Sequence, residues 1–210
     1  MSVCNKVIIL SSHSKFREQC YRLLQYLSTF LKEYYFRFHS KKYWTINTFK
    51  RLEAHVSACR KLLRLGKFLE SFRNAQDSIN LHLKFDDVTT TLSHISMGCY
   101  FIFDNIGWIN SIILNSINTN VSKTASRFWF LSLSCLILRD SERLYNLNKL
   151  SATKNIVRKK LIQDLLKNSL DLLVAYVSLK NMQKAKMWAA ICGIISTLIN
   201  LRRVYLSVTV

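Results

Sequence analysis

The chain has 210 residues and is strongly basic, with 31 lysines and arginines against 12 aspartates and glutamates, a formal net charge of +19. It contains no proline and four glycines, which excludes a turn-dense β-sandwich, a collagen-like repeat and a proline-rich linker. Half of the residues are hydrophobic, which argues against disorder. The composition therefore predicts an all-α protein whose surface meets an anionic lipid or a nucleic acid.

Amphipathic helices are predicted in the first third of the chain. Residues 14–38 carry apolar side chains at spacings of three and four, which is the period of one helix face. Residues 45–65 repeat this pattern, and Gly66 follows a basic last turn, which is typical of a helix end. Beyond Gly66 the apolar residues move to the opposite side, so we expect a break there rather than one long helix.

The predicted helix over residues 45–65 combines an apolar stripe with a basic surface. The stripe comprises Phe49, Leu52, Val56, Cys59 and Leu63. The cations on or beside the opposing surface are Lys50, Arg51, Arg60, Lys61 and Arg64. Against one acid, Glu53, they give 5 − 1 = +4, which an anionic leaflet would stabilise by roughly 4 kcal/mol at most. We predict that the stripe enters one leaflet and the cations contact lipid headgroups; a solvated face of a helical bundle is the alternative.

The most apolar long segment covers residues 92–117. Its one charge is Asp104, and it is long enough to cross a bilayer. A polar stripe along it would have to be hidden against protein, which leaves a membrane segment, a core helix or an interfacial helix as interpretations. The stripe comprises Asp104, Ser111, Asn115 and Asn118. Asp86 and Asp87, just before this segment, are expected at a helix start.

The last third of the chain is predicted to end in a membrane anchor. Residues 128–138 form an apolar run too short to span a bilayer alone, and residues 156–180 form another amphipathic helix. Residues 187–201 are uncharged and flanked by lysines and arginines, so we predict a short anchor, with a buried helix as the alternative. Small residues in this segment suit self-association of helices. They are Ala189, Gly193 and Thr197.

No pattern of catalysis, cofactor binding or metal binding occurs in the sequence. The glycines are isolated and form no phosphate-binding loop. His55 and Cys59 share a helix face, but a zinc site needs two further ligands. The six cysteines are scattered, which is typical of free buried thiols. We expect no enzymatic activity, no cofactor and no metal.

A basic motif, Arg60-Lys61-Leu62-Leu63-Arg64-Leu65-Gly66-Lys67, closes the helix over residues 45–65 and is preceded by Arg51-Leu52-Glu53. Together they resemble the hallmark of the peroxin-eleven family of peroxisomal membrane proliferation proteins. The resemblance covers nearly the whole chain. Its other elements, in order, are Leu24-Gln25-Tyr26, Tyr100-Phe101, Asp104-Asn105 with Trp108, Arg139-Asp140 and the C-terminal segment rich in small residues.

The resemblance implies one helical membrane domain over residues 1–210, a membrane-associated bundle of amphipathic helices with one or two hydrophobic membrane segments. Its location would be the peroxisomal membrane or the membrane of a peroxisome-derived organelle. The helix around the basic motif would insert into the cytosolic leaflet and elongate the membrane before fission. The implied partners are an anionic phospholipid membrane, further copies of the chain, and fission factors that include a dynamin-related GTPase. In this chain the segment before the anchor is short, and the anchor has only fifteen uncharged residues.

The sequence also allows two other functions. The polar stripe from Asp104 to Asn118 would line the path of a metabolite pore, a role also proposed within the family, although helix packing accounts for it more simply. The net charge of +19 also allows a soluble helical nucleic-acid binder. Because the basic residues are spread along the whole chain between apolar runs, we expect no nucleic-acid partner.

Overall fold

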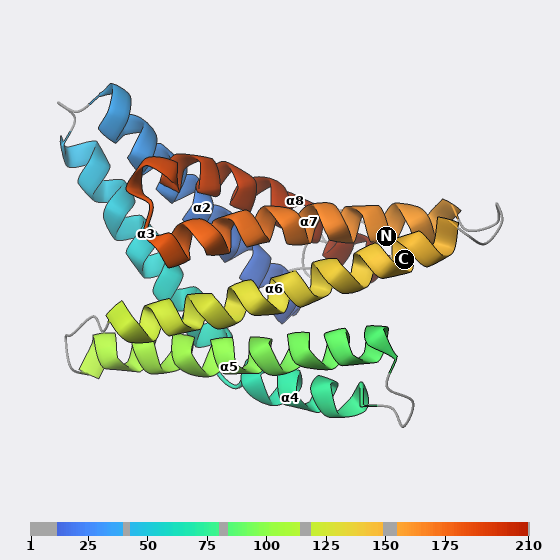
Figure 1. The fold of residues 1–210 in the computed structure, drawn as a ribbon. Helices are drawn as coiled ribbons and strands as arrows, with labels where there is room; N and C mark the ends of the chain where they lie inside the picture. Colours follow the sequence, from blue (N-terminus) through green and yellow to red (C-terminus); the bar gives the residue numbers. More distant parts are fainter. Residues whose placement is uncertain (1–11, 40–42, 80–83, 114–118, 149–154, 210) are drawn as a thin grey trace. The chain divides into compact units, whose positions relative to one another are not determined.

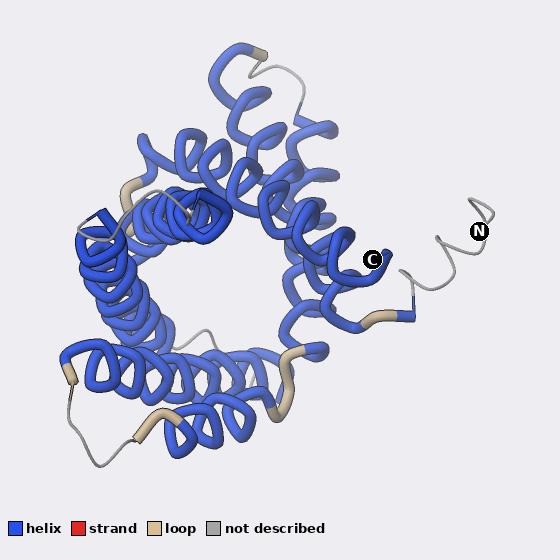
Figure 2. The backbone as a smooth tube through the Cα atoms, turned by 90° about the vertical axis from the view of Figure 1, so that its right-hand side faces the viewer, coloured by secondary structure: helices blue, strands red, loops and turns tan. Residues whose placement is uncertain are grey.

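The computed structural model describes residues 12–39, 43–79, 84–113, 119–148 and 155–209, and within these ranges the chain is helical and has no strand (Figures 1 and 2). The all-α prediction is therefore confirmed for the described residues. The helices are α2 (Ser14–Phe38), α3 (Tyr43–Leu63), α4 (Lys67–Asp77), α5 (Phe85–Ile113), α6 (Thr119–Asn148), α7 (Asn155–Lys180), the short 3-10 helix η1 (Gln183–Ala185) and α8 (Lys186–Thr209).

The helices fall into two compact units. Unit 1 comprises residues 1–63 and 182–210, and in it α2 packs against both α3 and α8. Unit 2 comprises residues 64–181, and α4, α5, α6 and α7 pack in chain order, each against its neighbours (Figure 1). The sequence predicted one domain because it has no linker, and the chain indeed crosses between the units directly, at Leu63–Arg64 and at Asn181–Met182.

The break predicted at Gly66 is present. α3 ends at Leu63, and Gly66 has a φ of 81°, a left-handed conformation that glycine adopts without steric cost. The N–H of Lys67 donates to the carbonyl of Arg64 at 3.1 Å, which closes the turn before α4. Among the described residues, Asn181 is the other one with a positive φ, at 49°. Both left-handed residues therefore lie close to a crossing between the units.

Burial on α5 of unit 2 favours small and polar residues over large aliphatic ones, although α6 and α7 bury Leu133, Leu161 and Val174. On α5 the buried side chains include Thr89, Ser93 and Ser96, while its aliphatic side chains point outward. Small and polar residues between helices, with large apolar residues facing outward, are typical of helices that pack within lipid. The hydroxyl of Ser132 on α6 donates to the carbonyl of Ser93 at 3.0 Å, so these buried polar groups bond to one another.

Candidate membrane-contact site

The inner side of α3 is held against α2 by polar and aromatic contacts. The Oε2 atom of Glu53 lies 2.7 Å from Lys32 Nζ, and its Oε1 atom accepts a hydrogen bond of 2.8 Å from the hydroxyl of Thr29. The ring of Phe49 stacks on that of Tyr35, with centroids 6.0 Å apart. Because these residues are spaced four apart on α3, they fix which side of the helix faces α2.

The predicted apolar stripe is divided between two environments. Val56 is 7% exposed, and Phe49 and Leu63 are half-buried, so these three lie toward the interior of unit 1. Leu52 is 41% exposed and Cys59 is exposed as well. Only two members of the stripe are therefore available at the surface while α3 is packed on α2.

Two exposed apolar side chains that the predicted stripe omitted, Trp44 and Leu62, lie on one arc of α3 with its exposed members, Leu52 and Cys59. At 100° per residue they fall within about 80° of one another, next to the side that packs on α2. Leu62 is 57% exposed and Trp44 is 80% exposed. We call this surface the outer strip; it comprises Trp44, Leu52, Cys59 and Leu62. A tryptophan at one end is typical of helices that lie at a membrane–water interface.

The predicted headgroup cations are also divided. Lys50 and Arg51 are exposed and Lys61 is half-buried on α3. Arg60 donates from Nη1 to the side-chain oxygen of Gln25 on α2. Three of the five cations therefore remain at the surface of α3, and Arg60 is engaged in packing the helix.

Arg64 is directed into unit 2. It is 8% exposed, its Nη2 lies 2.7 Å from Asp104 Oδ2, and its Nη1 donates to the hydroxyl of Tyr100 at 2.8 Å. Its guanidinium also lies over the rings of Tyr100 and Phe101. Helical periodicity extended to residue 65 would place Arg64 with the other cations. Because α3 ends at Leu63, that extrapolation fails at the last turn, and the structure places Arg64 away from the surface cations.

The C-terminal segment forms a longer helix than its uncharged run suggested. Residues 183–207 make the one helix in the described part of the chain that is long and apolar enough to cross a membrane. α8 has 24 residues, a length of about 36 Å, against about 30 Å of bilayer hydrocarbon. The anchor predicted over residues 187–201 is thus extended by further helical turns that include Arg202 and Arg203.

The row of small residues on α8 faces α2 of the same chain. Ala189, Gly193 and Thr197 are buried, and a Cβ atom added to Gly193 would lie 2.6 Å from ring carbons of Tyr26. This is the close helix approach that small residues allow. Self-association through this row stays a prediction, and it would require α8 to separate from α2.

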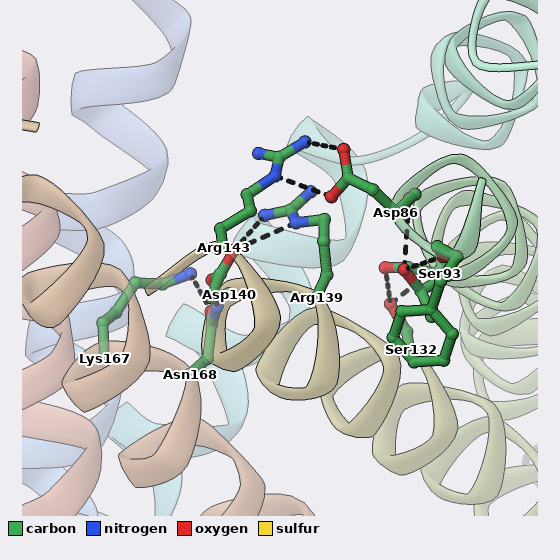
Figure 3. A network of polar contacts seen from close by, with 10 residues as sticks. Asp86, Ser93, Ser132, Arg139, Asp140, Arg143, Lys167 and Asn168 are labelled. Carbon is green, nitrogen blue, oxygen red and sulfur yellow. Dashed lines mark hydrogen bonds and ion pairs between the residues drawn. The ribbon is translucent and has the colours of Figure 1, made fainter. Parts of the chain in front are cut away.

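A polar network that the sequence did not reveal joins α5, α6 and α7 (Figure 3). Arg143 donates from Nε and Nη2 to the two carboxylate oxygens of Asp86, at 2.7 Å each. Asp140, which is almost fully buried, accepts two bonds from Arg139 on Oδ1 and one of 3.1 Å from Asn168 on Oδ2. The one signal in the sequence was the Arg139-Asp140 pair of the family resemblance.

The described part of the polar stripe is engaged within the protein. Asp104 is paired with Arg64, and Ser111 donates its hydroxyl to the carbonyl of Trp108 at 2.7 Å. Asn115 and Asn118 lie outside the described residues. Asp104 is thus bonded to Arg64 outside α5, while Ser111 is bonded within its own helix.

The cysteines and histidines show no metal-binding arrangement in the ranges that the structure describes. No group of three or more His, Cys, Asp or Glu side chains there could hold an ion. The five described cysteines are free thiols, but only Cys135 is buried and Cys59 is exposed. The expectation of buried thiols is thus correct for one of them and wrong for Cys59, because Cys59 lies on the outer strip.

Comparisons with known proteins agree on one family. The family model of peroxisomal biogenesis factor 11 matches residues 4–205, across both units. Peroxisomal membrane protein PMP30A of Candida boidinii is 29% identical over 161 residues, which are 70% of this chain and 61% of that protein. Human peroxisomal membrane protein 11A is 30% identical over 126 residues, 59% of this chain and 51% of that protein. Human peroxisomal membrane protein 11B is 29% identical over 140 residues, which are 67% of this chain and 53% of that protein. The chain thus spans between half and two thirds of these relatives' lengths, and no solved structure matches it.

Proposed function

Because the chain belongs to the peroxisomal biogenesis factor 11 family and is a protein of the peroxisomal membrane, we propose that it promotes peroxisome elongation, fission and proliferation. The observation that carries the mechanism is the outer strip, an exposed apolar surface beside cations on a helix. An apolar strip of this kind sinks about 5–10 Å into the boundary between headgroups and acyl chains. The inserted helix occupies area in the cytosolic leaflet alone, and this asymmetry bends and extends the membrane.

In this mechanism α8 holds the chain in the bilayer while α3 enters one leaflet. Lys50, Arg51 and Lys61 contact anionic headgroups, and Leu52, Cys59 and Leu62 contact the acyl chains. Phe49 and Val56 keep their contacts with unit 1, so insertion through the outer strip requires no separation of α3 from α2. The proposal includes self-association and recruitment of fission factors, a dynamin-related GTPase among them, which the family resemblance supports.

The native thiol of Cys59 gives a direct test in the full chain. The protein is reconstituted into phosphatidylcholine vesicles with or without phosphatidylglycerol and treated with a membrane-impermeant maleimide. We expect Cys59 to react in neutral vesicles, and anionic lipid to shield it. Equal labelling in both lipids would overturn insertion of α3, because α8 anchors the protein in either case and only the lipid charge differs.

A matched pair of variants connects this shielding to membrane shape. Leu52→Glu places a charge on the outer strip, whereas Ala54→Glu makes the same charge change at an exposed position outside it. Loss of one buried leucine removes about 1.5–3 kcal/mol of apolar stabilisation. Leu52→Glu should therefore abolish tubulation of anionic vesicles, and Ala54→Glu should retain it. Tubulation by both variants, with Cys59 unshielded in one, would separate membrane bending from insertion and contradict the mechanism.

A further inference from the structure

α5 presents an apolar stripe along most of its length. The members recur at spacings that keep them on one side of the helix, and each is between 40% and 73% exposed. We call this the α5 stripe; it comprises Val88, Leu92, Ile95, Ile106, Ile109 and Ile113. From Leu92 to Ile113 the helix rises about 32 Å, close to the 30 Å or so of bilayer hydrocarbon.

The opposite side of α5 carries polar residues, and several of them bond within the protein. The hydroxyl of Thr89 donates to the carbonyl of Phe85 at 2.8 Å, and Ser93 bonds to Ser132 of α6. Among the described residues, the segment 183–207 is the one apolar enough on average to cross a membrane, so any contact of α5 with lipid is through its stripe.

Asp104 is the one charge on α5 beyond its first turn, and it projects away from the stripe. It lies nine residues after Ile95, which is half a revolution at 100° per residue. A lone carboxylate in hydrocarbon is costly, so such residues pair with a cation inside the protein. The pair here has a distance of 2.7 Å, with side chains only 9% exposed for Arg64 and 13% for Asp104.

We propose that Arg64 is the counter-ion that allows α5 to lie in the bilayer hydrocarbon, with the α5 stripe against acyl chains. Bonded to Asp104 and Tyr100 and covered by the rings of Tyr100 and Phe101, the guanidinium forms a neutral, desolvated unit with the carboxylate. The last arginine of the basic motif thus acts inside the protein and does not bind a headgroup. This role is independent of whether α3 inserts.

The first arm of the test needs no variant. The full chain is reconstituted into phosphatidylcholine vesicles that contain a phospholipid with a diazirine on its acyl chain, and the photo-adducts are mapped by mass spectrometry. We expect adducts on the α5 stripe as well as on Ile195 and Leu198 of α8, which serve as the internal standard. Adducts on α8 without any on the α5 stripe would overturn the proposal.

The second arm separates a counter-ion from a headgroup ligand. Arg64→Gln or Asp104→Asn alone leaves one uncompensated charge, and should lower the ratio of α5 to α8 adducts by about tenfold. The double variant carries neither charge, and should restore the ratio to within about twofold of wild type. A headgroup ligand would show no such rescue, so a double variant as poor as Arg64→Gln overturns the counter-ion role.

The two proposals fail in different measurements. Shielding of Cys59 depends on anionic lipid and reports on α3, while α5 adducts are expected in neutral phosphatidylcholine. Arg64→Gln with Asp104→Asn should leave the shielding of Cys59 unchanged. Adducts on α5 with Cys59 unshielded would contradict the insertion of α3 and support the place of α5 in the hydrocarbon. Shielded Cys59 without adducts on α5 would contradict the counter-ion proposal alone.

Discussion

Arg60 and Arg64 lie four residues apart in the basic motif, and each directs its guanidinium to a partner inside its own unit. Arg60 bonds to Gln25 of α2, while Arg64 bonds to Tyr100 and Asp104 of α5. A helical wheel would place both on one basic face. The charge that α3 offers to a lipid surface therefore comes mainly from Lys50, Arg51 and Lys61.

Neutralising two exposed cations of α3 should weaken its insertion strongly. Lys50→Gln with Arg51→Gln removes about 2 kcal/mol of attraction to an anionic leaflet, at about 1 kcal/mol per charge. The ratio of shielded to labelled Cys59 in phosphatidylglycerol vesicles should fall roughly 30-fold, since 1.4 kcal/mol is a factor of ten. Arg60→Gln is the control, because that side chain is already bonded to α2. An equal loss in the control would mean that packing of α3, and not its surface charge, sets the ratio.

The reactivity of the Cys20 thiol should depend on pH. Burial raises the pKa of the Cys20 thiol, so less of it is thiolate at neutral pH. Cys20, half-buried on α2, should react with a maleimide more slowly than exposed Cys59 in neutral vesicles, and should gain rate as the pH rises toward its pKa. Peptide mass spectrometry over a pH series measures both rates in one sample. A Cys20 rate that is flat with pH would show that access alone limits it.

Residue roles were predictable from the sequence only where local spacing decides them. Spacing identified Phe49 and Val56 as members of one apolar side of α3, and Asp86 and Asp87 as first-turn acids of α5. It could not show that Arg143 pairs with Asp86, because the two are 57 positions apart and belong to different helices. Such partners depend on how helices pack, which one sequence does not encode in any local pattern.

At the scale of elements, helix bounds followed closely from apolar periodicity and from the rarity of helix breakers. The predicted helix over residues 14–38 coincides with α2, and that over residues 45–65 is displaced by two residues toward the C-terminus relative to α3. α6 was recognised only as an apolar run over residues 128–138, because its flanks are polar and lack periodicity. Its ends are stabilised by packing on α5 and α7, which is a tertiary effect.

The contact between α2 and α8 should depend on one pair of residues. Gly193→Ala puts a methyl group 2.6 Å from the Tyr26 ring, so α8 must shift, at a cost of about 1–3 kcal/mol. Tyr26→Leu in the same chain should recover most of this stability. Thermal unfolding of the reconstituted protein, followed by circular dichroism, measures the effect. Independent, additive losses in the double variant would show that the two side chains are not in contact.

Gly98 on α5 is a second glycine in close contact with an aromatic ring, and the effect of alanine there can be compared with that at Gly193. A Cβ atom there would lie 2.8 Å from the end of the Phe72 ring on α4. Phe72 is partly exposed and can swing outward, whereas Tyr26 is half-buried and lies closer to its glycine, at 2.6 Å. Gly98→Ala should therefore lower the unfolding temperature less than Gly193→Ala. A larger effect at Gly98 would mean that α4 is the more rigid neighbour.

At the scale of the whole molecule, the two proposed attachments to the membrane follow different physics. Burial of α8 in hydrocarbon does not depend on ionic strength, while the attraction of α3 to anionic lipid is screened, with a Debye length near 3 Å at about 1 M salt. High salt should therefore expose Cys59 to the impermeant maleimide and leave the chain in the membrane pellet. Release of the chain by salt would show that α8 is not an anchor.

The division into two units had no signal in the sequence, because no linker marks either crossing.

The outward-facing aliphatic residues of α5 and α8 also bear on how the protein is made. With the proposed contacts of α5 and α8 to acyl chains, a newly synthesised copy in water would expose several isoleucines and leucines at once. Such a copy would tend to aggregate with other copies before it reaches its bilayer. Biosynthesis, rather than unfolding in place, would then be the stage at which this protein is most vulnerable.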